Sequence, residues 1–92
     1  QALRIVVNSE IDNLKKGLEG AFSILAPNGR LAVISFHSLE DRAVKLFFTR
    51  LAQDRRARLI NKKPIVASEE EIRTNRRARS AKLRIIEKIA NN

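Results

Sequence analysis

Apolar residues recur at helical spacing between residues 11 and 25. The set that shares one face is Ile11, Leu14, Leu18, Ala21, Phe22 and Leu25. This spacing predicts an amphipathic helix, with Ser9 as its N-cap and Asp12 in the first turn, where a carboxylate favours the helix dipole. Gly17 and Gly20 each cost a helix roughly 1 kcal/mol relative to Ala. They therefore suggest a place where another element packs closely, and the alternative is a plain weakness of the helix.

A turn and a short apolar run follow this helix. Pro27-Asn28-Gly29 has the residue types of a turn, and residues 31–34 are all apolar. A continuous apolar run of this length is typical of a strand covered on both faces, as in a parallel sheet. The sequence thus predicts a helix, a tight turn and a doubly buried strand.

A second helix is predicted from Ser38, as N-cap, to about Ala52. The apolar face expected for it consists of Leu39, Ala43, Phe47 and Leu51. Glu40 and Asp41 are adjacent, and a helix points adjacent side chains about 100 degrees apart. We expect them to act as first-turn partners of the helix dipole rather than as a paired acid and base.

The last third of the chain predicts short elements. Leu59-Ile60 and Ile65-Val66 flank a segment that contains Pro64, which indicates an edge or broken strand. Residues 68–71 form a capping box for a short helix ending near Asn75. Residues 81–89 fit a strand better than a helix. The resulting order of helix, strand, helix, strand, short helix and strand predicts an α/β fold, like the closing third of a doubly wound sheet with a terminal antiparallel hairpin.

The distribution of charged residues along the chain indicates a candidate ligand. The formal net charge is +9, and residues 55–84 carry nearly all of the excess, with more Arg than Lys. A basic cluster of this kind is the electrostatic footprint expected for a nucleic-acid backbone. The alternatives are a solvated face and a surface that meets an acidic protein.

Composition limits the classes of protein. The chain has no Cys, which excludes disulfides and thiolate metal sites and fits a cytoplasmic location. The apolar run at residues 31–34 is far shorter than the roughly 20 residues of a membrane span, so we expect no membrane crossing. No metal-ligand spacing is present. Ninety-two residues suffice for one small domain or part of one, and the start at Gln1 without Met suggests a fragment.

The candidate site lies directly after the predicted strand. In open α/β sheets, ligands bind beyond the carboxyl ends of strands, and residues 35–38 occupy that position. Ser35 and His37 are the candidate catalytic residues, and Phe36 offers a stacking surface for an unpaired base. Ser38 and Arg42 are candidate substrate-binding residues. The alternative for His37 is a strand-end residue that is bonded only to backbone.

Several blocks of the sequence resemble one known family. They are Gln1-Ala2-Leu3-Arg4-Ile5 with Asn8, Pro27-Asn28-Gly29-Arg30-Leu31, Ser35-Phe36-His37-Ser38-Leu39-Glu40-Asp41-Arg42, Lys63-Pro64-Ile65, and Arg77-Ala78-Arg79-Ser80-Ala81-Lys82-Leu83-Arg84. Together they resemble the C-terminal part of the RsmH (MraW) family. The resemblance implies a Rossmann-like class I methyltransferase that uses S-adenosyl-L-methionine to methylate the N4 amine of a cytidine in small-subunit ribosomal RNA. Ser35, the carbonyl of Phe36 and His37 are then candidate acceptors for the protons of that amine.

The same resemblance sets the limits of this chain. It implies that residues 1–92 form the C-terminal part of the methyltransferase domain, with the cofactor-binding half and an inserted helical domain upstream, so that this chain supplies no cofactor-binding residue. It also implies an RNA-facing segment, for which Arg77 and Arg79, with Lys82 and Arg84, are the candidates. The family usually has Asn-Pro where this chain has Asn75-Arg76, which predicts a looser turn.

A different class of function fits the size and charge as well. The chain alone satisfies the requirements of an RNA- or ribosome-binding module without catalysis. A small DNA-binding or protein-interaction domain fits less well, because neither a helix-turn-helix nor an exposed apolar groove is evident. The pattern makes no prediction about the oligomeric state.

Overall fold

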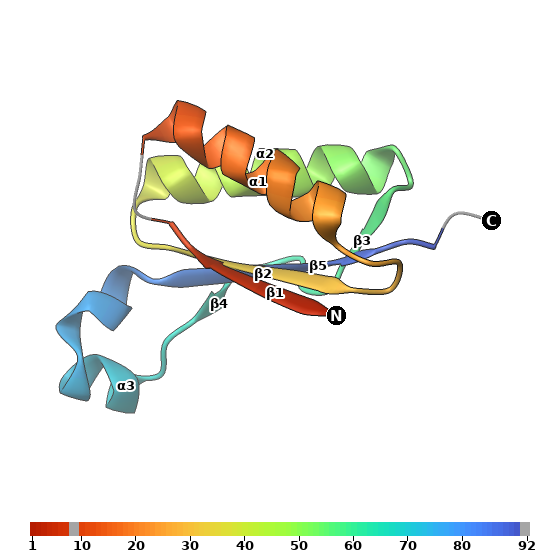
Figure 1. Cartoon of the computed structure of the whole chain (residues 1–92). Helices are drawn as coiled ribbons and strands as arrows, with labels where there is room; N and C mark the ends of the chain where they lie inside the picture. The colour runs from red at the N-terminus through yellow and green to blue at the C-terminus, as the bar shows by residue number, and fades with distance from the viewer. Residues whose placement is uncertain (8–9, 91–92) are drawn as a thin grey trace.

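The computed structural model describes residues 1–7 and 10–90 of the chain (Figure 1). Its elements are β1 (Ala2–Val6), α1 (Ile11–Ile24), β2 (Arg30–Ser35), α2 (Ser38–Gln53), β3 (Ala57–Leu59), β4 (Ile65–Val66), α3 (Glu69–Thr74), the 3-10 helix η1 (Arg76–Ser80) and β5 (Lys82–Lys88). The predicted α/β class is confirmed, and so is the strand at residues 81–89. Strand β1 was not predicted. The predicted N-cap Ser9 lies outside the described residues.

The strands form one mixed sheet. Their order is β1-β2-β5-β3, with β4 also paired to β5. Strands β1 and β2 are parallel, whereas β5 runs antiparallel to β2 on one side and to β3 and β4 on the other. The predicted antiparallel pairing at the C-terminus is therefore confirmed, with β5 inserted between β2 and the two short strands. This is the sheet expected of the C-terminal portion of a Rossmann-like methyltransferase.

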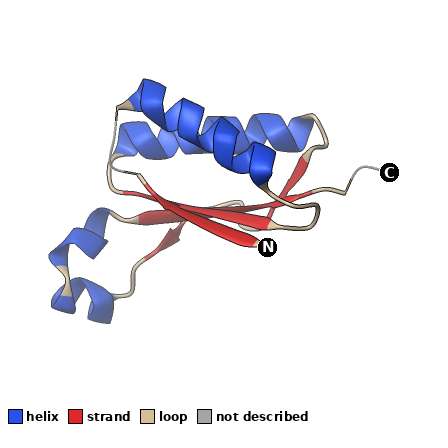
Figure 2. Ribbon diagram, in the orientation of Figure 1, coloured by secondary structure: helices blue, strands red, loops and turns tan. Residues whose placement is uncertain are grey.

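Helices α1 and α2 lie side by side on the same face of the sheet (Figures 1 and 2). Between these two layers Leu18 from α1, Leu31 from β2 and Ile86 from β5 are completely buried. Each side chain of this size contributes about 1.5–3 kcal/mol when it is fully buried. The apolar face predicted for the first helix is confirmed by the burial of Leu14, Leu18 and Phe22.

The prediction that residues 31–34 are covered on both faces is wrong for the described part of the chain. Leu31 and Val33 are buried beneath the helices, but Ala32 and Ile34 point to the opposite face and are half-buried. Successive strand residues alternate between faces, and both long helices cover the same face. Neither α1 nor α2 covers the opposite face, which adjoins η1 only at the carboxyl ends of β1 and β2.

Helix α2 buries a different face from the predicted one. Val44, Phe48 and Leu51 are buried, whereas Leu39 is 71% exposed. The N-cap position is taken by His37, whose side chain makes no capping hydrogen bond, so the predicted cap at Ser38 is also wrong. The buried face is set by the sheet beneath the helix, which the spacing of apolar residues alone does not reveal.

The turn between α1 and β2 has the predicted chemistry. Pro27 and Asn28 occupy its central positions, Asn28 has a φ of 68°, and the Gly29 amide donates to the Ala26 carbonyl at 2.8 Å, the pattern of a type II turn. A Cβ on Gly29 would lie 2.8 Å from that same carbonyl oxygen. By contrast, a Cβ built on Gly17 or Gly20 would meet no other element of the described chain within 4 Å, so the predicted close packing at these glycines is wrong.

Helix α2 ends in a Schellman motif. The amide of Arg56 donates to the Leu51 carbonyl at 2.9 Å, and the amide of Arg55 donates to the Ala52 carbonyl at 3.1 Å. Arg55 has a φ of 58°, a left-handed conformation that is usually given to Gly at this position. A side chain in this conformation costs about 1–2 kcal/mol.

The break between β3 and β4 is bridged by one side chain. The Asn61 amide donates to the carbonyls of Lys63 and Leu83, and its oxygen accepts the Ile85 amide at 2.8 Å. These bonds replace ladder bonds next to Pro64, which has no backbone donor. Beyond the break, Ser68 accepts the Glu71 amide at 3.2 Å, which confirms the predicted cap of α3.

Candidate functional site

The carboxyl ends of β1 and β2 meet at one end of the sheet, where α3 and η1 also lie (Figure 1). A hollow of about 280 Å³ opens there. It is lined by Val6, Phe36, Asn75, Arg77, Ala78 and Ala81, and we call it the junction hollow. Ligands of open α/β sheets bind at this kind of position. The predicted location of the site is therefore occupied by a concave surface built from both halves of the chain.

Two predicted site residues meet in the junction hollow. The guanidinium carbon of Arg77 lies 5.1 Å from the centre of the Phe36 ring, within the range of a cation–π contact. Asn75 holds the start of η1 in place, because its side-chain oxygen accepts the Arg77 amide at 3.1 Å. Phe36 comes from the end of β2 and Arg77 from η1. Only the fold brings these two side chains together.

Strand alternation separates Ser35 from Phe36. Ser35 is 2% exposed and lies on the face covered by the helices, whereas Phe36 is half-buried and lines the junction hollow. His37 and Ser38 are exposed at the beginning of α2, and the His37 carbonyl accepts the Asp41 amide at 3.0 Å. The four adjacent residues thus face three different surroundings.

A buried ion pair supports the start of α2. Arg84 on β5 donates to both carboxylate oxygens of Asp41, at 2.7 and 3.0 Å, and the Lys82 ammonium lies 3.9 Å from the same carboxylate. Asp41 is 7% and Arg84 8% exposed. The expectation that Arg84 faces RNA is therefore wrong: it lies beneath α2, on the same sheet face as Ile86. Glu40 is buried as well, and its Oε1 atom has no hydrogen-bond partner among the described residues.

The other predicted substrate-binding residues are exposed. Arg42 lies in the first turns of α2, and Arg79 lies on η1, two residues after Arg77. Arg76 is the first residue of η1. Pro is favoured at a first helical position because its missing N–H needs no partner there. The segment that begins at Arg76 forms a regular 3-10 helix, where a looser turn was expected.

The far end of the sheet carries a second group of charges. Glu87 accepts from Arg30 at 3.2 Å and from Arg58 at 2.8 Å, which links β2, β5 and β3. The hydrogen bonds from Arg30 and Arg58 lower the pKa of the Glu87 carboxyl below its ordinary value of 4.5. Sequence reasoning did not identify this triplet, because its three members are far apart in the chain.

The described residues do not fit a methyl-donor cradle. Such a cradle needs glycines in a loop after a strand, so that the backbone approaches the ligand closely. Gly17 and Gly20 are in α1, and Gly29 is in the turn before β2. Within residues 1–7 and 10–90, no group of three or more His, Cys, Asp or Glu side chains is placed to hold a metal ion. No helix in this part of the chain is long and apolar enough to cross a bilayer.

The fold and the hollow define an α/β protein with its candidate site at the carboxyl ends of parallel strands. The chain belongs to the MraW methylase family, whose sequence profile matches residues 1–89. This membership confirms the resemblance seen in the sequence blocks.

Several curated relatives are about half identical to this chain. The chain is 50% identical to the ribosomal RNA small subunit methyltransferase H of Treponema denticola, with 97% of the chain and 33% of the relative covered. It is 50% identical to the protein of that name from Carboxydothermus hydrogenoformans, with 98% and 34% covered. For the Synechococcus relative of that name the identity is 54%, with 98% and 29% covered. The chain thus spans about a third of the length of these relatives.

Proposed function

We propose that the protein carrying this chain methylates small-subunit ribosomal RNA. The finer proposal is that the acceptor is the N4 amine of a cytidine and that S-adenosyl-L-methionine supplies the methyl group. Support comes from the names of the relatives and from family membership. Small-subunit ribosomal RNA is the partner that this function requires, and the cytoplasm is the location that we propose with it.

The observation that carries the proposal is the contact between Phe36 and Arg77 in the junction hollow. Proteins that recognise unpaired bases stack them on aromatic rings and on guanidinium planes. Here both surfaces line one hollow at the end of the sheet where ligands bind. We assign Phe36 and Arg77 to holding the target base, and Arg42, Arg79 and Ser38 to contacts with the adjoining backbone.

The acceptor amine requires a further contribution from the site. Its lone pair is delocalised into the pyrimidine ring, so the site must orient the amine and accept its protons. His37 is exposed and directly follows Phe36, which lines the hollow, and the Phe36 carbonyl is a second acceptor. Ser35 remains a candidate, but its hydroxyl lies on the helix-covered face. We therefore expect His37 to contribute more than Ser35.

We do not expect this chain to bind the methyl donor. S-adenosyl-L-methionine supplies an electrophilic methyl group, and the described residues form no cradle for it. This chain contributes the substrate side of the site, and residues 1–92 are proposed as the C-terminal part of the methyltransferase domain. The chain alone is expected to be inactive.

His37→Ala and Ser35→Ala in the intact protein test this function. Methyl transfer to small-subunit RNA and RNA binding are measured separately. We expect His37→Ala to lower the rate of transfer about 10²–10⁴-fold, the usual contribution of a positioned acid or base, and to leave RNA binding nearly unchanged. RNA binding without methylation by the wild-type protein would favour the alternative, an RNA-binding module without catalysis.

A further inference from the structure

Two groups of arginines in the last 40 positions lie at opposite ends of the molecule. Arg77 and Arg79 are beside the junction hollow, whereas Arg55, Arg56 and Arg58 follow the end of α2 at the opposite end of the sheet. The start of β2 and the end of β5 lie at that same far end. The Ile89 amide donates to the Arg56 carbonyl, and the Asn28 amide donates to the Lys88 carbonyl. The molecule is elongated, with principal extents of 46 × 26 × 21 Å.

The far end carries five arginines and is basic on both sides of the sheet. Arg30 and Arg58 bind Glu87 on the face opposite α1 and α2, whereas Arg50 and Arg56 lie on the helix side. We call this end the distal basic end, and it consists of Arg30, Arg50, Arg55, Arg56 and Arg58, with Asp54 and Glu87 among them. The side chains of Arg30 and Arg58 are 54% and 63% exposed although both bind Glu87. A guanidinium has five N–H donors. Donors therefore remain on both residues for an external anion.

Arg55 occupies a backbone position at which Gly would be more stable. It is exposed and has a left-handed φ of 58° at the C-terminal Schellman motif of α2. Residues held in such conformations concentrate at functional sites. A cation here is also favoured by the negative end of the helix dipole. Within residues 1–7 and 10–90, the Arg55 side chain makes no hydrogen bond or ion pair that would offset the backbone cost.

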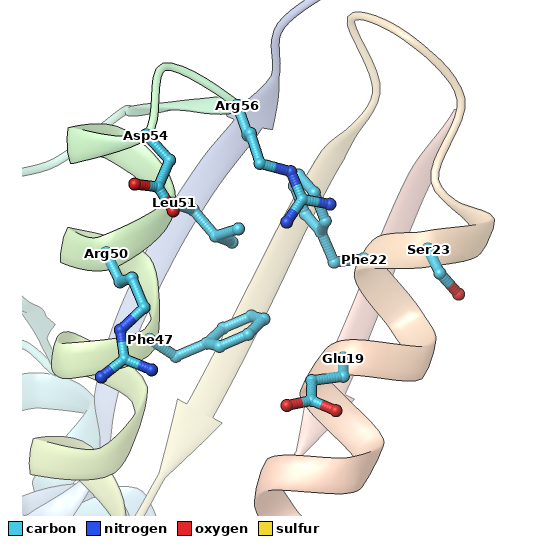
Figure 3. Close-up of a pocket in the computed structure, with 8 residues that line it drawn as sticks. All are labelled: Glu19, Phe22, Ser23, Phe47, Arg50, Leu51, Asp54 and Arg56. Carbon is cyan, nitrogen blue, oxygen red and sulfur yellow. The ribbon is translucent and has the colours of Figure 1, made fainter.

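A groove between α1 and α2 adjoins these arginines (Figure 3). Arg50 and Arg56 border it, the ring of Phe47 points into it, and the Arg56 guanidinium lies 5.3 Å from the centre of the Phe22 ring. The volume of the groove is about 240 Å³. Aromatic rings interleaved with guanidinium groups favour nucleic acid over a purely ionic ligand.

We propose that the distal basic end is a second RNA-binding surface, which holds phosphates of the same RNA whose base enters the junction hollow. This inference rests on the proposed function for the identity of the RNA. Two basic surfaces at opposite ends of an elongated molecule match a long polyanion, because a single nucleotide cannot reach both. Arg suits phosphate because its planar fork binds two oxygens at once. An acidic protein is the competing partner.

The test is the salt dependence of RNA binding by the intact protein. Fluorescence anisotropy with a small-subunit RNA fragment is measured over a range of salt concentrations for the wild type and for Arg55→Gln/Arg58→Gln. The slope of log K against log salt should fall by about 0.7 for each lost phosphate contact on a single strand. We expect a decrease of about 1.4 for the double variant. Arg55→Lys/Arg58→Lys, which keeps both charges, should retain most of the slope.

Lys16→Gln/Lys62→Gln is the matched control, because it removes two exposed charges away from both ends. Its slope should stay close to that of the wild type. Equal slopes for the arginine variant and this control would overturn the proposal and leave an acidic protein as the partner.

Arg55→Gly supplies a second and independent readout. Gly relieves the left-handed backbone, so the midpoint of thermal unfolding should rise, while the salt slope should fall by about 0.7. A rise in the midpoint with an unchanged slope would contradict the inference. A protein that binds RNA with these slopes but does not methylate it would refute the proposed function and leave the second RNA surface standing.

Discussion

Arg84 on β5 and Asp41 in the first turn of α2 form a buried, two-bonded ion pair, with donor–acceptor distances of 2.7 and 3.0 Å. Asp41 also donates its backbone amide to the His37 carbonyl. The pair therefore connects the middle of the sheet to the turn that presents Phe36 and His37. The geometry of the candidate site depends on a charge pair on the opposite side of β2 from the junction hollow.

Removing one partner of this pair should destabilise the protein. Arg84→Met leaves the Asp41 carboxylate buried without its cation, for which the expected cost is about 3–5 kcal/mol. Urea unfolding of the intact protein measures it. The double variant Asp41→Leu/Arg84→Met should recover most of the loss, because a buried pair replaced by apolar side chains is often neutral. A double variant as unstable as the single one would show that the pair itself carries the stability.

Two leucines should respond to the same substitution with very different losses of stability. Leu18 is completely buried between α1 and the sheet, whereas Leu39 is 71% exposed on α2. Leu18→Ala should cost about 2–5 kcal/mol of unfolding free energy, and Leu39→Ala less than about 0.5 kcal/mol. Chemical denaturation of the two variants compares them directly. Equal losses would contradict the observed orientation of α2.

Glu87 predicts a pH dependence of stability. Arg30 and Arg58 lower its pKa in the folded protein below 4.5, so the folded state binds the proton less readily than the unfolded state. The resulting stabilisation is present above the unfolded pKa and is lost as the pH falls through the folded pKa. The wild type should exceed Glu87→Gln in stability near neutral pH, and the difference should shrink below about pH 4.5. A difference that stays constant down to about pH 3 would contradict this account.

Features that depend on residues close together in the chain could be predicted from the sequence. The period of α1, the turn around Asn28 and the cap at Ser68 each depend on residues within a few positions of one another, and the structure confirms all three. Strand β1 was missed because Leu3 and Ile5 alternate with exposed residues at one edge of the sheet over only five residues.

Features that depend on residues far apart in the chain could not be predicted from the sequence. Arg84 pairs with Asp41, and Asn61 replaces ladder bonds to β5, yet nothing near either residue in the chain indicates the partner. Phe36 and Arg77 were each predicted as site residues, but their contact depends on the placement of η1. Arg84 was a candidate RNA-facing residue, but its side chain is buried beneath α2, where it pairs with Asp41.

Arg77 should contribute to RNA binding through its shape as well as its charge. Arg77→Lys keeps the charge but loses the planar guanidinium over Phe36. We expect Arg77→Lys to weaken RNA binding by about 0.5–1 kcal/mol, the usual value of an exposed cation–π contact. Arg77→Gln should weaken it further and reduce the salt slope by about 0.7. Equal binding by the wild type and Arg77→Lys would assign Arg77 to charge alone.

Arg73→Lys is the control for this pair of variants, because Arg73 is an exposed arginine on the neighbouring helix α3 and does not line the junction hollow. Its affinity for RNA should match that of the wild type.

The most direct test of the central claim is the rate of methyl transfer to small-subunit RNA by Phe36→Ala and Phe36→Trp in the intact protein. Phe36→Trp keeps a stacking ring and should retain most of the activity. Phe36→Ala should lose the base–aromatic stack, worth about 1–3 kcal/mol, and transfer should fall about 5- to 150-fold at limiting RNA. Circular dichroism confirms that both variants are folded. Wild-type rates for a folded Phe36→Ala would contradict the assignment of the junction hollow as the base-binding wall of the methyltransferase.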